Sequence, residues 1–162
     1  GARQVLGDDQ IEWLINALKF SRATFKFVVI GGQFLNSAEM FENLGNLAPA
    51  ERRRILDAID AEDIPGVVFL SGDRHQSMLM KKERDTDYPL YEWTVSPLTA
   101  GAGRSLDQPG QYLVEGSQYN RRAFGTVSVS GPRDDRVATL TLHDSDGQPV
   151  WSSEIRAREL YP

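Results

Sequence analysis

The sequence contains no cysteine, so disulfide bonds, thiolate catalysis and cysteine-based zinc sites are excluded. Histidine is scarce, with His75 and His143 as the two imidazoles in 162 residues. No apolar run approaches the roughly 18 residues of a membrane-spanning helix. The first residues, Gly-Ala-Arg-Gln-Val-Leu-Gly-Asp, resemble neither a signal peptide nor a natural start of translation, and the absent Met suggests processing, cloning or cleavage.

Positively charged residues are fewer than negatively charged ones. The sequence has 18 Lys and Arg against 23 Asp and Glu, which gives a net charge of −5. The surface as a whole therefore has no basic field that would attract nucleic acid or an anionic membrane. A small anionic substrate would need local positive charge from arginines or bound cations. The 40% hydrophobic and 25% charged content is typical of a globular protein, and the length suits one domain.

Helical and strand patterns alternate in the first half of the chain. Apolar residues recur at helical spacing from about residue 8 to 20, after acidic residues that favour a helix start. The apolar stretch "FKFVVIGGQ" predicts a buried strand and a tight loop. Residues 34–47 show no clear period and predict a long loop with at most one helical turn. A second helix begins near Pro49 and ends before Pro65 and Gly66.

A second buried strand, "VVFLSGD", follows this helix. Strand, helix and strand of these lengths predict a βαβ crossover at about 8–76, with the two strands parallel and adjacent. Ligands of such sheets bind beyond the carboxyl ends of the strands. The loops 31–33 and 72–75 are therefore expected to meet at one crevice.

The second half of the chain has a different character. "YPLYEWTVSPLTAG" predicts another strand, and residues 101–122 an irregular surface excursion. Three segments that alternate apolar and polar residues, "AFGTVSVSG", "RVATLTLHD" and "PVWSSEIR", predict an antiparallel β-meander. The β-meander part of the chain is placed at about residues 88–155. The tryptophans and tyrosines of this half (Trp93, Trp151, Tyr112 and Tyr119) are assigned to the core or to sheet faces.

The stretch with most chemical content is "VVFLSGDRHQS", residues 67–77. In an extended segment the side chains at i and i+2 point the same way, so Asp73 and His75 would converge at the strand exit. They would form either an acid–base pair or two metal ligands, and Arg74 could bind a phosphate. The spacing fits equally a turn capped by Asp73 with a locally bonded His75.

Other polar residues carry weaker signals. The amides of Gln33 and Asn36 could ligate a hard cation or orient a substrate oxygen, or they could serve as turn residues. His143 is expected to be a solvated surface residue. Metal-free hydrolysis by His75 would need a nucleophile, for which Ser71 and Ser77 are near in sequence.

Five segments in this order resemble the C-terminal half of PhoD-like alkaline phosphatases, in the calcineurin-like metallophosphoesterase superfamily. They are "LGDDQIEWLINALKFSRATFKFVVIGGQ", "APAERRRILDAI", "GVVFLSGDRHQS", "YPLYEWTVSPLTAGAG" and "AFGTVSVSGP". The resemblance spans about residues 5–155. Its most specific parts are the LG-x-x-Q-x-x-WL helix and the strand that ends in Gly-Asp-x-His.

The resemblance implies an α/β fold, namely the C-terminal half of a two-layer metallophosphoesterase β-sandwich flanked by helices and ending in an antiparallel β-meander. It implies hydrolysis of phosphate esters, of the alkaline phosphatase or phosphodiesterase type, at two divalent or trivalent metal ions (Fe, Ca, Mn or Zn). Asp73 and His75 match the last metal-binding motif, Arg74 a variable position of that motif, and Gln33 a strand-end loop that approaches the centre. The family implies a periplasmic or secreted protein.

The metal motifs that precede residue 8 in the family have no counterpart here. Asp73 and His75 alone are too few to hold two ions. The chain is therefore interpreted as the C-terminal portion, 1–162, of a single catalytic domain, whose partner is the missing N-terminal half or a second copy. The alternative is a non-catalytic α/β module that binds a small anion or a partner protein.

Overall fold

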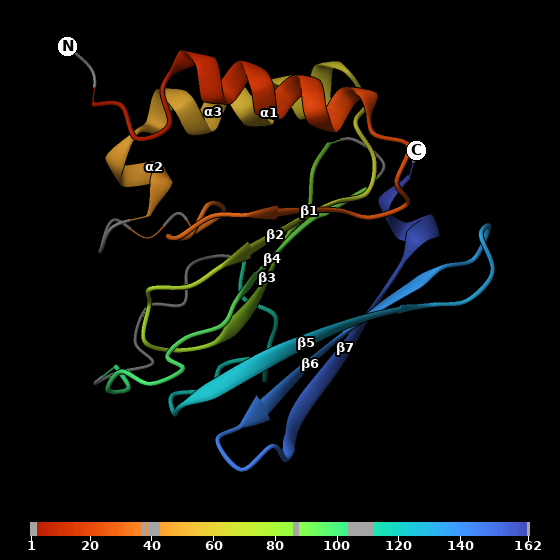
Figure 1. Cartoon of the computed structure of the whole chain (residues 1–162). Helices are drawn as coiled ribbons and strands as arrows, with labels where there is room; N and C mark the ends of the chain where they lie inside the picture. Colours follow the sequence, from red (N-terminus) through yellow and green to blue (C-terminus); the bar gives the residue numbers. More distant parts are fainter. Residues whose placement is uncertain (1–2, 37, 39–42, 86–87, 104–111, 162) are drawn as a thin grey trace.

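The computed structural model describes residues 3–36, 38, 43–85, 88–103 and 112–161. It shows two β-sheets, with helices over the outer face of the first sheet and the second sheet against its other face (Figure 1). Parts of two predicted loops, residues 37, 39–42 and 104–111, lie outside the described residues. No helix in the described ranges is long and apolar enough to cross a lipid bilayer.

The first sheet has four strands in the order β1 (Lys26–Val29), β2 (Val67–Ser71), β4 (Leu90–Thr94) and β3 (Met78–Lys82). β1 pairs with β2 in parallel, which confirms the predicted crossover, and β2 pairs with β4 in parallel. β3 returns antiparallel to β4. Strand β3 was not predicted from the sequence, because its "MLMKK" stretch follows the polar turn with no glycine or proline to mark a strand start.

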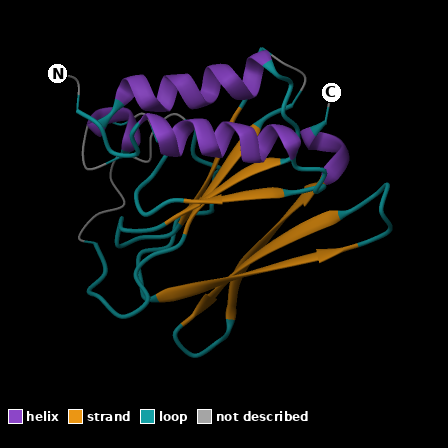
Figure 2. Cartoon of the chain, turned by 45° about the horizontal axis from the view of Figure 1, so that its top comes forward, coloured by secondary structure: helices purple, strands orange, loops and turns teal. Residues whose placement is uncertain are grey.

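Helices α1 (Asp8–Phe20) and α3 (Pro49–Ala61) lie side by side over one face of this sheet (Figure 2). Both predicted helices are confirmed, including the start of α3 at Pro49. A short α2 (Leu44–Leu47) forms a helical turn within the predicted long loop. The apolar stripes of the helices meet the sheet in one core, which includes Ile11, Leu18, Ile55, Ile59 and Phe69.

The terminal segments form the predicted antiparallel meander, in the order β5 (Ala123–Ser130), β6 (Val137–Asp144) and β7 (Pro149–Arg156), followed by the 3-10 turn η1 (Ala157–Leu160). Its inner face packs on the first sheet in a second core, which includes Leu79, Trp93, Leu140, Leu142 and Ile155. The predicted place of Trp93 in the core is confirmed, since 2% of it is exposed.

Gly125 explains how closely the two sheets approach. A Cβ atom at this position would lie 2.4 Å from Cη2 of Trp93, so only glycine leaves room for the indole ring. The described part of the predicted excursion also packs on the first sheet, because Tyr119 bridges to Ser77 and Leu113 to Met80. That segment therefore covers the outer edge of β3 and leaves the opposite edge of the sheet, at β1, unpaired among the described residues.

Candidate functional site

The carboxyl ends of the parallel strands meet at one edge of the first sheet. The Gly72 N–H donates to the carbonyl oxygen of Gly31 at 3.1 Å, which joins the loop after β2 to the loop after β1. The Val95 N–H donates to the carbonyl of Ser71 at 2.9 Å, which adds the end of β4. The two loops therefore meet as the crossover predicted.

Asp73 and His75 lie in a tight turn beyond β2. Both have left-handed backbone conformations, with φ of 64° for Asp73 and 54° for His75. The extended geometry that the sequence suggested for this triplet is wrong, and the i, i+2 argument for convergence does not apply. Left-handed residues other than glycine cost about 1–2 kcal/mol each and persist only where surrounding contacts impose them.

Those contacts come from segments distant in sequence. The His75 N–H donates to Oγ of Ser96 at 2.9 Å, and its carbonyl accepts from the N–H of Gly103 at 2.7 Å. Ser96 is itself tied to Ser77, whose Oγ accepts from the Ser96 N–H at 3.2 Å. The turn is thus held by the loop after β4, while the side chains of Asp73 and His75 remain exposed.

Arg74 lies between these two residues and is half-buried. Burial lowers the pKa of its guanidinium, and the neighbouring Asp73 carboxylate opposes that shift. The turn therefore presents a carboxylate, a guanidinium and an imidazole on three consecutive residues.

A buried polar network lies behind the turn and centres on Glu92 of β4, which is fully buried. Its Oε1 accepts from the Phe34 N–H at 2.8 Å and from Oγ of Ser71 at 2.6 Å, and its Oε2 accepts from the Leu35 N–H. Burial raises the pKa of Glu92, against the opposing effects of these hydrogen bonds and of the charge on Arg52. One side chain thereby links the ends of β1, β2 and β4.

Gln33 belongs to this network. It is fully buried, its Nε2 donates to Oγ1 of Thr94 at 2.9 Å, and its Oε1 accepts from Nδ2 of Asn36 at 2.6 Å. Arg52 of α3 completes the support of this loop, because Nε donates to the Phe34 carbonyl at 2.6 Å. Gln33 and Asn36 therefore lie behind the exposed turn, within the packed interior.

Glu92 and Arg52 were not predicted from the sequence. Glu92 had a detectable signal, since a single charge interrupts the apolar stretch "LYEWT" of a buried strand. Arg52 had none, because it lies among charged residues of a surface helix.

The family model for PhoD-like phosphatases matches residues 1–131. The chain belongs to this family. A solved structure described as "Structure of PhoD" shares the fold, with a TM-score of 0.60 at 18% sequence identity over 91% of this chain. The match covers 35% of the PhoD chain, so the PhoD polypeptide extends well beyond the region shared with these residues. No curated protein matches the chain.

The exposed turn brings a carboxylate and an imidazole together on neighbouring residues, and both groups are common metal donors. The Asp73 carboxylate and the His75 imidazole suit Fe, Mn or Zn, and the carboxylate also suits Ca. Within the described ranges no group of three or more His, Asp or Glu residues is placed to hold an ion. Among the described residues the turn therefore offers two donors of suitable chemistry and no complete ligand set.

The other predicted residues make separate contacts. His143 is on the meander, where its ring stacks on Phe124 with centroids 4.9 Å apart and its Nε2 lies 3.0 Å from Oγ1 of Thr126. Ser71 and Ser77 are buried, and Ser71 donates to Glu92 while Ser77 donates to the Ser96 carbonyl. Neither hydroxyl is presented as a nucleophile beside His75.

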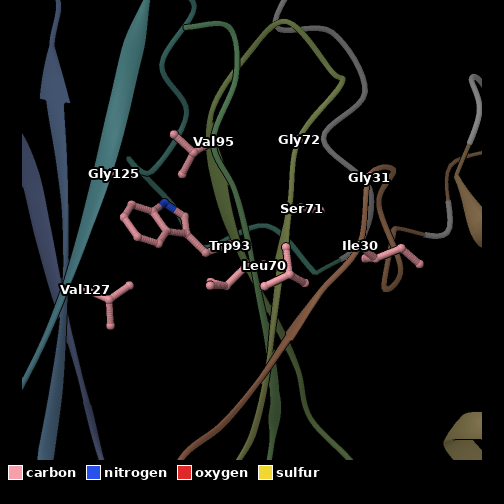
Figure 3. Close-up of a pocket in the computed structure, with 10 residues that line it drawn as sticks. Ile30, Gly31, Leu70, Ser71, Gly72, Trp93, Val95, Gly125 and Val127 are labelled. Carbon is pink, nitrogen blue, oxygen red and sulfur yellow. The ribbon is translucent and has the colours of Figure 1, made fainter. Parts of the chain in front are cut away.

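A cavity of about 400 Å³ opens on the meander side of the same sheet edge. Figure 3 shows the Trp93 ring beside Gly125 and Val127, and Ile30 and Leu70 also line the cavity. The lining is mostly apolar and includes neither Asp73 nor His75. It therefore offers shape and an apolar surface, but no group for phosphate chemistry.

Proposed function

We propose that this chain supplies the last two protein ligands of a dinuclear metal centre that hydrolyses phosphate esters, as an alkaline phosphatase or phosphodiesterase. The observation that carries the proposal is the turn beyond β2, where Asp73 and His75 are exposed in strained left-handed conformations. Backbone strain of this kind is concentrated at functional sites. Membership of the PhoD-like phosphatase family supports the same conclusion.

Each residue of the turn has a distinct task in this proposal. The carboxylate of Asp73 and one ring nitrogen of His75 would hold metal ions. When bound, such ions polarise phosphoryl oxygens and lower the pKa of a bound water. Arg74 would bind a phosphate oxygen of the substrate, and burial of its guanidinium makes that contact stronger than one in bulk water.

Gln33 acts behind the centre in this proposal. Its amide links Thr94 to Asn36 and so fixes the loop that faces the turn. Glu92 fixes the same loop through the Phe34 and Leu35 amides. The Gly72 N–H, which donates to the Gly31 carbonyl at 3.1 Å, joins that loop to the segment that carries the turn.

Two protein donors do not satisfy two ions, so the proposal includes a partner. The other ligands would come from the remainder of a longer polypeptide or, as the alternative, from a second copy of the chain. The family also supports an exported protein, which we propose to be periplasmic or secreted.

The test is hydrolysis of p-nitrophenyl phosphate and bis(p-nitrophenyl) phosphate by the full-length protein that contains these residues, loaded in turn with Mn, Fe, Ca and Zn. Asp73→Asn should reduce kcat by at least about a hundredfold, because a neutral amide binds a cation far more weakly than a carboxylate. Asp134→Asn, in the exposed β5–β6 turn, is the matched control. Unchanged hydrolysis by a folded Asp73→Asn protein would remove the turn from the mechanism.

The competing function, a non-catalytic module for a small anion or a partner protein, makes a different prediction for the 162-residue chain. An ion that binds only the folded state must raise its melting temperature. A rise with Mn or Zn that is absent in His75→Gln supports the metal site. No rise with any of the four ions, together with no hydrolysis by the full-length protein, favours the binding module.

A further inference from the structure

The first sheet has an open edge at β1. The Lys26 N–H donates to the Gly66 carbonyl at 2.7 Å and the Ile30 N–H to the Leu70 carbonyl at 3.0 Å, so these residues point toward β2. Backbone groups alternate sides along a strand, so Phe27 and Val29 direct their N–H and C=O groups away from β2. Among the described residues no strand pairs with that side. Such an edge is a template for another strand.

Apolar hollows lie on both faces of the sheet at this edge. The hollow on the helix side, about 330 Å³, is lined by residues that include Trp13, Leu14 and Ala17 of α1. The hollow on the meander side is the cavity of Figure 3. Val29 and Ile30 of β1 line both hollows, while Val29 is 78% exposed and Trp13 65% exposed.

This geometry specifies the side chains of an incoming strand. Successive side chains of a strand point to opposite faces, so a strand paired with β1 would place them alternately in the helix-side and meander-side hollows. Both hollows are mostly apolar. The strand must therefore be apolar on both faces, which is the pattern of a strand buried in the interior of a sheet.

Positive charge gathers at one end of the edge. Arg22, Arg133 and Arg136 line a third hollow, of about 390 Å³, together with Phe25, Phe27 and Val129. No carboxylate lines this hollow, and the ion pairs found among the described residues include none of the three arginines. An acidic side chain on the incoming strand would complement them.

We propose that the open edge of β1 binds an extended strand from a part of the protein outside these 162 residues, apolar on both faces and acidic where it passes Arg133 and Arg136. The length of the related PhoD chain supports this source, since the shared region covers 35% of it. A second copy of β1 fits less well, because residues 21–36 contain no Asp or Glu and would bring Arg22 and Lys26 toward the same arginines.

The proposal is independent of the metal chemistry, and its test needs no metal or substrate. The probe is a synthetic peptide, acetyl-Glu-Glu-Val-Thr-Val-Val-Val-Thr-amide, added to the 162-residue chain up to about 1 mM, and amide hydrogen exchange is followed residue by residue. We expect exchange at Phe27 and Val29 to slow at least about tenfold, while the amides of Val68 and Leu70, already bonded within the sheet, stay unchanged.

Matched probes and variants separate the two parts of the proposal. A peptide with Lys in place of both Glu residues should bind at least about tenfold more weakly, and Arg136→Gln should reduce that difference. Val29→Lys, which places a charge at the apolar edge, should abolish the protection. Each variant is first shown to keep the melting temperature of the parent chain, so that loss of binding is not loss of fold.

Three outcomes overturn the proposal. The first is no slowing at Phe27 and Val29 at the highest peptide concentration. The second is equal protection by the acidic and basic peptides. The third is a dimer of the free chain, detected by light scattering, whose Phe27 and Val29 amides are already protected, because a second copy would then occupy the edge.

Discussion

Replacing Glu92 by alanine is expected to cost about 2–4 kcal/mol of unfolding free energy. The carboxylate accepts hydrogen bonds from the Phe34 and Leu35 N–H groups and from the Ser71 hydroxyl, and it is fully buried. Ser71 can turn to Oγ1 of Thr94, 2.9 Å away, whereas the Phe34 and Leu35 amides lose the carboxylate that accepts their hydrogen bonds. Each buried amide left unpaired costs about 1–3 kcal/mol of unfolding free energy. Removal of the carboxylate also removes its desolvation penalty, which offsets part of this loss.

Urea unfolding followed by tryptophan fluorescence measures this loss. A difference of about 3 kcal/mol lowers the midpoint by about 1–3 M at the urea m-values of small proteins, about 1–3 kcal/mol/M. Glu92→Gln keeps one acceptor oxygen and should lose about half as much. Glu83→Ala, which removes an exposed carboxylate from the end of β3, serves as the control and should change stability by less than about 0.5 kcal/mol.

The pH dependence provides a second check on the same residue. Burial raises the folded-state pKa of Glu92 above its ordinary 4.5, so the folded state holds this proton more tightly than the unfolded state. The contribution of Glu92 to stability is therefore greatest below pH 4.5 and declines as pH rises through its folded pKa. Equal stability of the parent and Glu92→Ala below pH 4.5 would refute the assigned role of the network, and a stability difference that grows as pH rises would refute the raised pKa.

Three further predictions follow from the structure. Gly125→Ala should destabilise the chain by about 1–3 kcal/mol, because its Cβ would lie 2.4 Å from Trp93. The control Gly101→Ala has open space around the new methyl group and should leave the melting temperature unchanged. Equal melting temperatures for the two variants would contradict the packing of Gly125 against Trp93. His75→Gly should raise the unfolding free energy by about 1 kcal/mol, because glycine adopts a φ of 54° without steric cost. The same change removes a proposed metal donor. A loss of stability would contradict the assignment of backbone strain to His75. Burial favours a higher pKa for Glu51, but hydrogen bonds from the Leu6, Gly7 and Val5 amides outweigh it and lower the pKa. The stability difference between the parent and Glu51→Gln should therefore be full above the ordinary pKa of 4.5 and vanish as pH falls through the lowered value, and a constant difference in acid titrations would refute it.

Much of the fold could be predicted from local sequence patterns. The helix of residues 8–20, the start of α3 at Pro49 and the two parallel strands follow from side-chain spacing and from proline and glycine positions. The meander followed from three alternating segments. β3 could not be found in this way, because Met78–Lys82 becomes a strand by pairing antiparallel with β4.

The candidate site, too, could be predicted from the sequence only in part. The motif Gly-Asp-Arg-His at the end of an apolar strand was enough to single out Asp73 and His75. Their left-handed conformation was not, since neither is glycine and the contacts that impose it come from Ser96 and Gly103. Glu92 acquired its role from amides 57 and 58 residues away.

The sequence by itself therefore determined the identity and order of most elements, the strand end that carries the chemistry, and the family resemblance. These depend on periodicity and on residue types that act over a few neighbouring positions. Only the tertiary structure decided the conformation of the turn, the burial of Gln33 and Glu92, and the open apolar edge of β1 with arginines at one end. These depend on which distant segments meet, and short-range residue preferences carry too little energy to specify such contacts.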